Sequence, residues 1–222
     1  MLELTRPGSP GSQFFAVTVM LLTVLANRTT TACRQDTTMT RLFAPVDIGA
    51  NLSLLPESER QALLHIVASA RAMDSIFLQQ VWAGNPSMLL ALINDQSAAH
   101  DALLDFFLLN KGPWSRVENN QEFVRGAPQK PSSANFYPAD ATKEEVEAWF
   151  QQLEGTARTE ATIFFTTIRR DRDGNFISVP YSMEYQGPLA IAAEQLRLAA
   201  RATAEPTLRH YLETRATAFE TQ

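Results

Sequence analysis

The chain has 222 residues, 45% of them hydrophobic, and a formal net charge of −5 at pH 7. This share of apolar residues excludes a disordered chain, and the slightly acidic balance, without a concentrated Lys/Arg surface, argues against a nucleic-acid partner. The single cysteine, Cys33, excludes an intrachain disulfide.

The first 41 residues have the pattern of an export segment followed by a tether. Residues 14–26 form an uncharged apolar run after Arg6. It is shorter than the roughly 20 apolar residues of a membrane span but fits the core of a secretory signal. Small residues then lead to Cys33, as at a bacterial lipoprotein cleavage site, although Thr30 stands where an aliphatic residue is usual. The alternative is a wrongly assigned start codon and a cysteine without a role.

We therefore predict a signal peptide over 1–32, of the lipoprotein type if Cys33 is lipidated, a tether over 33–41 and a folded domain over 42–222. The protein would be exported, either to the periplasm or to a membrane surface where the lipid on Cys33 would anchor it.

The first half of the folded domain has the pattern of helices. Residues 42–48 could form one extended segment. From Pro56, which is suited to a first helical turn, apolar residues recur at three- and four-residue steps to Val81 and predict a helix of about 25 residues. Gly84-Asn85-Pro86 breaks it. Two shorter helices are expected over 88–93 and 98–109, the second apolar on most sides and therefore central.

Residues 110–141 show no lasting period and are punctuated by Gly and Pro. Aromatic residues are spread through this stretch and are unfavourable in water, so we predict an ordered loop laid over the surface of the fold. These residues are Trp114, Phe123, Phe136 and Tyr137.

The second half mixes helices with a hairpin. Thr142 and Glu145 form a capping box that begins a helix, for which Gly155 is the predicted end. Residues 162–170 and 175–181 are rich in β-branched and aromatic residues and predict a hairpin, with Pro180 at an edge. Helices over 189–203 and 208–219 follow, separated at Glu205-Pro206. The predicted fold class is mainly α with a small β-hairpin.

The sequence predicts no catalytic residues and no metal-binding residues. His65, His100 and His210 lie in separate elements without metal-ligand spacing, and we expect a boundary residue, a solvated residue and half of an ion pair with Glu213, respectively. The acidic segment 171–175 lacks the outer ligands of a calcium loop and predicts a turn. No serine lies in a nucleophile elbow.

Three stretches, in this order, carry a family resemblance. They are Asn110–Arg116 (NKGPWSR), Ser133–Asp140 (SANFYPAD) with the capping box after it, and Ile168–Asp171 through Asp173-Gly174 to Val179–Ser182 with Tyr185. Together they resemble the bacterial branch of the dipeptidyl peptidase III family of zinc metallopeptidases, from about Leu42 to the end of the chain.

The resemblance implies a two-lobed hydrolase with a wide cleft. One lobe would carry zinc on a His-Glu-x-x-x-His helix with a downstream Glu, and the other would hold the peptide. No His-Glu pair occurs in this chain, and the chain reaches Gln222 within a helical pattern. We therefore expect the amino-terminal part of such an enzyme, truncated before the zinc motif, a partial lobe that binds no zinc alone.

The resemblance also implies a substrate contact. Asn135, Phe136 and Tyr137 fall where the family presents an aromatic residue to the cleft, and a Tyr hydroxyl there could steady the carbonyl oxygen as negative charge develops. The alternative is that these aromatics anchor their own loop. Two functions remain open: part of an exported peptidase, inactive alone until the missing part completes it, or a non-catalytic lipoprotein that binds a peptide or protein partner.

Overall fold

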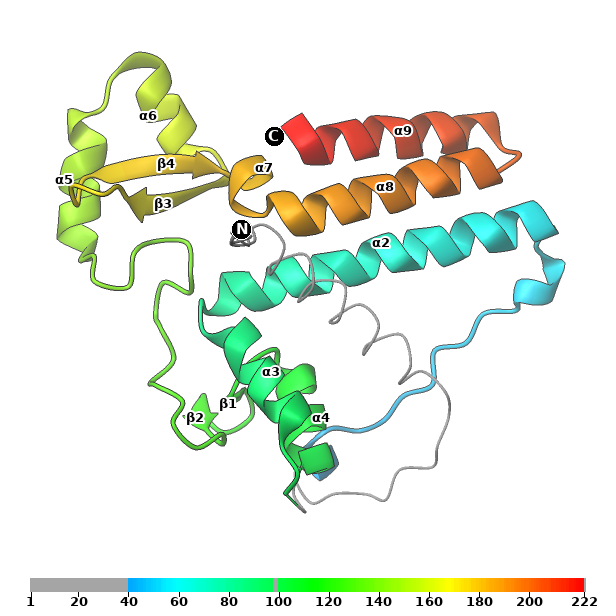
Figure 1. Ribbon diagram of the computed structural model, residues 1–222, viewed down its shortest axis with the longest axis horizontal. Coiled ribbons are helices and arrows are strands. Elements are labelled where there is room, and N and C mark those ends of the chain that lie inside the picture. Colours follow the sequence, from blue (N-terminus) through cyan, green and yellow to red (C-terminus); the bar gives the residue numbers. More distant parts are fainter. Residues whose placement is uncertain (1–39, 98–99, 222) are drawn as a thin grey trace, which may run out of the picture. The chain divides into compact units, whose positions relative to one another are not determined.

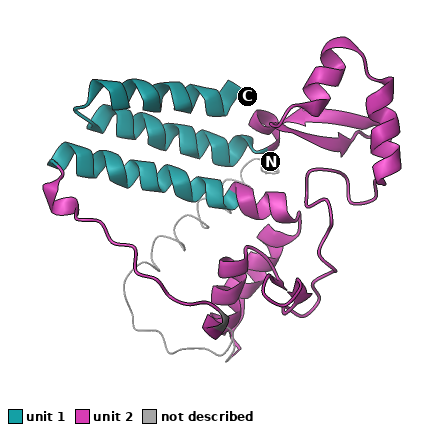
Figure 2. Cartoon of the chain, turned by 180° about the vertical axis from the view of Figure 1, so that it is seen from behind, with its two compact units in different colours: residues 1–33, 56–75, 185–221 teal, residues 34–55, 76–184, 222 magenta. Residues whose placement is uncertain are grey.

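The computed structural model describes residues 40–97 and 100–221 (Figure 1). The predicted signal peptide, Cys33 and nearly all of the tether lie outside these residues, so export and lipidation stay predictions. The described residues form two compact units, coloured separately in Figure 2: unit 1 comprises 56–75 and 185–221, and unit 2 comprises 40–55 and 76–184. The helix α2 (Glu57–Val81) contributes residues to both.

Unit 1 is built from three helices: the first part of α2, then α8 (Gln186–Ala202) and α9 (Pro206–Thr221). Its core is made largely of alanine, which lets helices approach closely. The buried cluster is Ala62, Ala193, Leu196, Ala199, Ala200, Leu212 and Ala216. The two predicted carboxyl-terminal helices are confirmed, and α9 begins at Pro206, where a missing backbone N–H is tolerated.

Polar contacts also join α2 to α8 and to the turn after it. The Thr203 hydroxyl donates to Glu59 Oε2 at 2.7 Å, and the Ala204 N–H donates to Glu59 Oε1 at 2.9 Å. His65 Nδ1 lies 2.9 Å from Gln195 Oε1. These contacts fix which face of α2 meets α8.

Unit 2 begins with two helices, α3 (Asn85–Asn94) and α4 (His100–Asn110). Leu104, Phe106 and Phe107 are at most 1% exposed, which confirms that α4 is central. The predicted break before α3 is also confirmed. A Cβ at Gly84 would lie 2.3 Å from the Trp82 ring, so only glycine lets that ring pack against the backbone.

The loop that follows is ordered, as predicted. The Trp114 side chain is 2% exposed, its Nε1 donates to the Pro128 carbonyl at 2.8 Å, and its ring meets Trp82 edge-on at 5.5 Å. Two short strands that the sequence did not predict, β1 (Trp114–Ser115) and β2 (Gln121–Glu122), pair antiparallel within it.

The remainder of unit 2 packs helices with a hairpin. The capping box of Thr142 and Glu145 is present at the start of α5 (Lys143–Gln152). Strands β3 (Thr166–Arg170) and β4 (Phe176–Pro180) pair antiparallel, with Ile168 opposite Ser178. The short helix α7 (Tyr181–Glu184) follows directly. The turn at 171–175 is held by Asp171 Oδ1, which accepts from the N–H groups of Asp173 and Asn175.

Two predictions about the chain before the hairpin were wrong: that Gly155 ends α5, and that the first strand begins at residue 162. Gly155 does not end α5: it begins another helix, α6 (Gly155–Thr162), with φ +54°. This helix ends at Thr162, where the predicted strand 162–170 was to begin, and β3 begins only at Thr166. Threonines usually favour strands, but Thr159 and Thr162 donate their hydroxyls to carbonyls four residues back, which accommodates them in a helix.

The segment 42–48 was also predicted imprecisely. It follows a single 3-10 turn, η1 (Thr40–Leu42), and has no regular secondary structure before η2 (Leu52–Leu54). The fold class is nevertheless confirmed as mainly α with a small β-hairpin, to which the structure adds a second two-stranded sheet. Of the helices in the described ranges, none has both the length and the apolar character to cross a membrane by itself.

Candidate functional site

The predicted substrate-binding segment lies against the carboxyl end of α2. Asn135 Nδ2 donates to the Gln79 carbonyl at 2.9 Å, and the Asn135 N–H donates to the Gln80 carbonyl at 2.8 Å. The last carbonyls of a helix have no partner inside the helix. Asn135 therefore caps α2 from a position 56 residues away in sequence.

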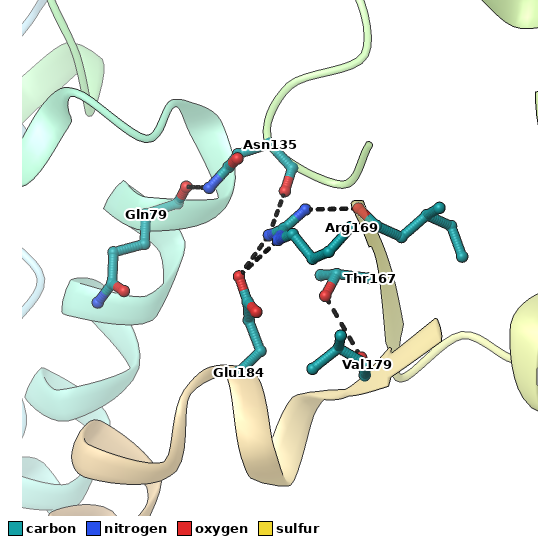
Figure 3. A network of polar contacts seen from close by, with 7 residues as sticks. Gln79, Asn135, Thr167, Arg169, Val179 and Glu184 are labelled. Carbon is teal, nitrogen blue, oxygen red and sulfur yellow. Dashed lines mark hydrogen bonds and ion pairs between the residues drawn. The ribbon is translucent and has the colours of Figure 1, made fainter. Parts of the chain in front are cut away.

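Arg169 on β3 holds the same segment from the other side, as Figure 3 shows. Its guanidinium donates to the Asn135 carbonyl at 3.0 Å and to the Ile168 carbonyl at 2.9 Å. Its Nε donates to Glu184 Oε1 at 2.9 Å, and Nη2 contacts the same oxygen. Both side chains of this ion pair are 22% exposed, so solvent screens the pair only in part. Arg169 thus joins the hairpin, the loop and α7.

Phe136 continues this attachment. The Ile168 N–H donates to the Phe136 carbonyl at 2.9 Å, so the loop adds a backbone hydrogen bond to β3. Because residues 135 and 136 are held on two sides, the position of Tyr137 is well defined. Tyr137 and Phe150 line two neighbouring hollows in unit 2.

The first hollow has a volume of about 490 Å³ and a mixed lining. Val146, Phe150 and Tyr137 supply apolar surface. Lys143 and Glu147 supply opposite charges, with Nζ and Oε1 3.6 Å apart on exposed side chains. The remaining lining residues are Ser132, Ser133, Ala141 and Thr142. This combination can accept an apolar side chain and bind the polar backbone or charged termini of a short peptide.

The second hollow has a volume of about 430 Å³ and, among the described residues, a lining without charged side chains. It is lined by Phe136, Tyr137, Phe150, Ala161, Thr162, Ile163, Phe164, Thr166, Ile168 and Tyr181, and none of these described residues is charged. Burial raises the pKa of Tyr181 above its ordinary value, against the opposing charge of Arg169. The Tyr181 hydroxyl therefore stays protonated at neutral pH.

The residues that the structure describes do not fit a zinc site. Within 40–97 and 100–221, no group of three or more His, Cys, Asp or Glu side chains lies close enough together to hold a metal ion. His65 contacts Gln195 and lies at a boundary, as predicted. His100 was predicted to be solvated, but its side chain is only 22% exposed, 3.7 Å from Asp101. His210 is exposed on α9.

No protein-family model matches the chain. Two solved structures are similar over 82% of the chain: dipeptidyl-peptidase III from Corallococcus sp. strain EGB, with 51% identity and a TM-score of 0.78, and DPP III from Caldithrix abyssi, with 36% identity and a TM-score of 0.74. The curated protein Nudix hydrolase 3 of Arabidopsis thaliana is 30% identical over 226 residues, or 80% of the chain.

The match covers 34% of each solved chain and 29% of the plant protein. The fold is therefore that of a helix-rich peptidase segment, and in particular it is dipeptidyl peptidase III-like, as the three sequence stretches indicated. The chain spans about a third of the length of the solved chains that it matches.

The site contains residues that sequence reasoning did not single out. Phe150 and Glu147 fell only within the helix predicted after Thr142, and Arg169 and Tyr181 only within the predicted hairpin, although each lies beside the segment 135–137. One signal was present: these residues belong to the resembling stretches or follow them closely. The substrate-binding role of Asn135, Phe136 and Tyr137 stays a prediction.

Proposed function

We propose that this chain is the amino-terminal portion of an exported, zinc-dependent dipeptidyl peptidase III-like hydrolase, and that it contributes a peptide-binding surface around Tyr137. The observation that carries the proposal is the 51% identity, at a TM-score of 0.78, with the Corallococcus dipeptidyl-peptidase III over 82% of the chain. The plant Nudix hydrolase supports it less, because the chain aligns with only 29% of that protein.

The zinc would be held elsewhere. The described residues bring no ligand set together, so the metal and the base that acts with it would come from polypeptide that corresponds to the other parts of the solved enzymes. Zinc would polarise the peptide carbonyl and activate water when bound. The residues of this chain would bind and orient the peptide.

The first hollow is the proposed place for that peptide. The ion pair of Lys143 and Glu147 is exposed, and exposed pairs contribute little to stability, about 1 kcal/mol at most. Either group can therefore re-pair with a charged end of a short peptide at small cost: Glu147 with an ammonium group, Lys143 with a carboxylate. Tyr137 belongs to the lining of the same hollow, and its hydroxyl would donate to a peptide carbonyl.

The test uses the full chain with and without the part of the Corallococcus enzyme that it does not match. The chain alone and the chain co-expressed with the remaining two-thirds of the Corallococcus enzyme are assayed for zinc content and for release of dipeptides from a peptide amino terminus. We expect neither in the chain alone and both in the pair. Stoichiometric zinc and peptide cleavage by the chain alone would contradict the proposal.

A pair of matched variants tests the site. Tyr137→Phe removes the hydroxyl of a residue that lines the first hollow, and we expect kcat/KM of the pair to fall about tenfold. Tyr211→Phe, at an exposed tyrosine of α9 that belongs to the lining of neither hollow, is the control and should retain activity. Export and anchoring are tested separately, by incorporation of labelled fatty acid into the chain and its loss in Cys33→Ser.

The alternative is a non-catalytic lipoprotein that binds a peptide or protein partner. It predicts that the full chain unfolds cooperatively and binds peptides at the first hollow, while co-expression with the remainder of a dipeptidyl peptidase III yields no activity.

A further inference from the structure

The connection between α6 and β3 exposes three consecutive large apolar residues. Ile163 is 47% exposed, Phe164 94% and Phe165 51%. Single exposed hydrophobic residues are ordinary, but a contiguous group usually marks a surface that another molecule covers. In the part of unit 2 that contains the hairpin, this is where a partner would gain most from burial.

The position of Phe164 is not a consequence of loose backbone. On one side, the Ile163 N–H donates to the Thr159 carbonyl at 3.1 Å and ends α6. On the other side, the Phe165 carbonyl accepts from the Tyr181 N–H at 2.8 Å. Both neighbours of Phe164 are hydrogen-bonded through their backbone to regular elements, so the backbone that carries the exposed ring is held in place and binding would cost little backbone ordering entropy.

The second hollow lies at the foot of this projection, since Ile163 and Phe164 belong to its lining. The exposed Phe164 ring could insert into a partner, and the mainly apolar hollow beside it could accept a side chain of that partner. None of the lining residues described for this hollow is charged. A free peptide ammonium needs an acidic partner, so this hollow suits an apolar side chain of a protein rather than the amino terminus of a dipeptidyl substrate.

We propose that Phe164 and the second hollow form a docking surface for the polypeptide that corresponds to the remaining two-thirds of the solved enzymes, with Phe164 as the anchor and an apolar side chain of that polypeptide in the hollow. The proposal rests on the proposed function, because the chain aligns with only 34% of the Corallococcus enzyme. A segment that aligns with a third of a larger fold is expected to leave apolar side chains exposed where the larger part packs.

The exposed area of this surface is that of one contact within a larger interface. Phe164, together with the exposed halves of Phe165 and Ile163, offers on the order of 400 Å², whereas a stable interface needs about 800 Å² from each partner. The surface is thus too small to form an interface alone and suits one anchor within a larger one. Such central aromatic anchors dominate interface energies.

The experiment co-expresses the full 222-residue chain with the part of the Corallococcus enzyme outside the matched third, and measures co-purification and the dissociation constant of the complex. We expect Phe164→Glu to weaken binding at least tenfold and Phe164→Leu to weaken it less. Tyr211→Ser, at a residue of α9 that is 56% exposed, is the matched control and should bind as wild type. Circular dichroism confirms that each variant folds.

A second measurement follows the surface itself. In the co-purified complex, hydroxyl-radical labelling of Phe164 should fall at least fivefold relative to the chain alone, while labelling of Tyr211 should change less. Unchanged labelling of Phe164, unchanged affinity of Phe164→Glu, or no complex with the wild-type chain would each overturn the inference. So would a homodimer, or binding to anionic lipid vesicles, that Phe164→Glu abolishes.

The two proposals fail in different ways. A complex that depends on Phe164 but neither binds zinc nor cleaves peptides refutes the proposed function and leaves the docking surface. An active complex whose affinity and activity ignore Phe164→Glu refutes the docking surface alone.

Discussion

The two units of the molecule are stabilised by different kinds of contact. In unit 1 the core is a repeated small residue: Ala193, Ala199 and Ala216 are fully buried between helices. In unit 2, individual aromatic rings and long polar side chains hold the chain segments together instead. Trp114 fills the loop, Asn135 caps α2, and the Arg169 guanidinium donates to two backbone carbonyls and a carboxylate.

The difference follows from the backbone that each unit must satisfy. A helix pairs most of its own backbone groups, so unit 1 depends mainly on close packing of its faces, to which polar contacts such as that of Glu59 with Thr203 are added. Irregular backbone leaves N–H and C=O groups that must find other partners when they are buried. Unit 2 meets this need with side chains from distant positions, and each such side chain should therefore matter more than any single alanine of unit 1.

The largest expected effect is that of Trp114→Ala. This change removes a ring that is 2% exposed and also frees the Pro128 carbonyl, so the free energy of unfolding should fall by about 4 kcal/mol. Hydrogen exchange should speed up across 100–128. Exchange in α8 and α9 should be nearly unchanged, because the contacts that Trp114 makes lie in unit 2.

Leu212→Ala is the matched change in unit 1, at another side chain that is 2% exposed. It should increase exchange in α8 and α9 and leave 100–128 protected. If both variants speed up exchange equally in both units, the units unfold in one cooperative transition, and their separate stabilities cannot be compared.

An intermediate effect is expected at Asn135. Asn135→Ala leaves the Gln79 carbonyl without its side-chain donor and should lower the free energy of unfolding by about 1 kcal/mol. Asn135→Asp should be worse, by about 0.5–1 kcal/mol, because a carboxylate would face the negative end of α2. Urea unfolding at pH 7 measures both differences.

Asn94→Ala supplies the control for this prediction. Its amide also donates to a carbonyl near a helix end, that of Leu90, but on an exposed residue. The cost should be smaller there. Equal stabilities for Asn135→Ala and Asn135→Asp would show that the amide does not cap α2 in solution.

Much of unit 1 could be predicted because its signal is local. Helical spacing of apolar residues placed α2, and the Glu205-Pro206 break separated the last two helices; both follow from the geometry of one helix face. The capping box of Thr142 and the turn at Asp171 are local in the same sense. Each depends on residues two to four positions apart.

The contacts that build the candidate site are not local, and this is why the sequence did not predict them. Asn135 meets a carbonyl 56 residues earlier, and Arg169 meets a carboxylate 15 residues later. No spacing rule links such positions. Residues 135–137 were singled out only through a family resemblance, and the helix α6 was missed because its threonines satisfy their hydroxyls within the helix.

The smallest expected effect concerns pH and returns to unit 1. Hydrogen bonds from the Thr203 hydroxyl and then the Ala204 N–H hold the pKa of Glu59 below its ordinary value of 4.5. A carboxyl whose pKa is lower in the folded state stabilises that state above the unfolded pKa, and this stabilisation is lost as the pH falls through the folded pKa. Glu59→Gln should therefore lower the Tm at pH 7 by a few degrees at most, with a difference from wild type that shrinks below pH 4.5.

Thr203→Val removes the same bond from its other end and should give a similar Tm, without a further drop in the double variant. Additive effects would mean that the two residues stabilise unit 1 independently. The hydrogen bond between Thr203 and Glu59 would then not be what stabilises this unit.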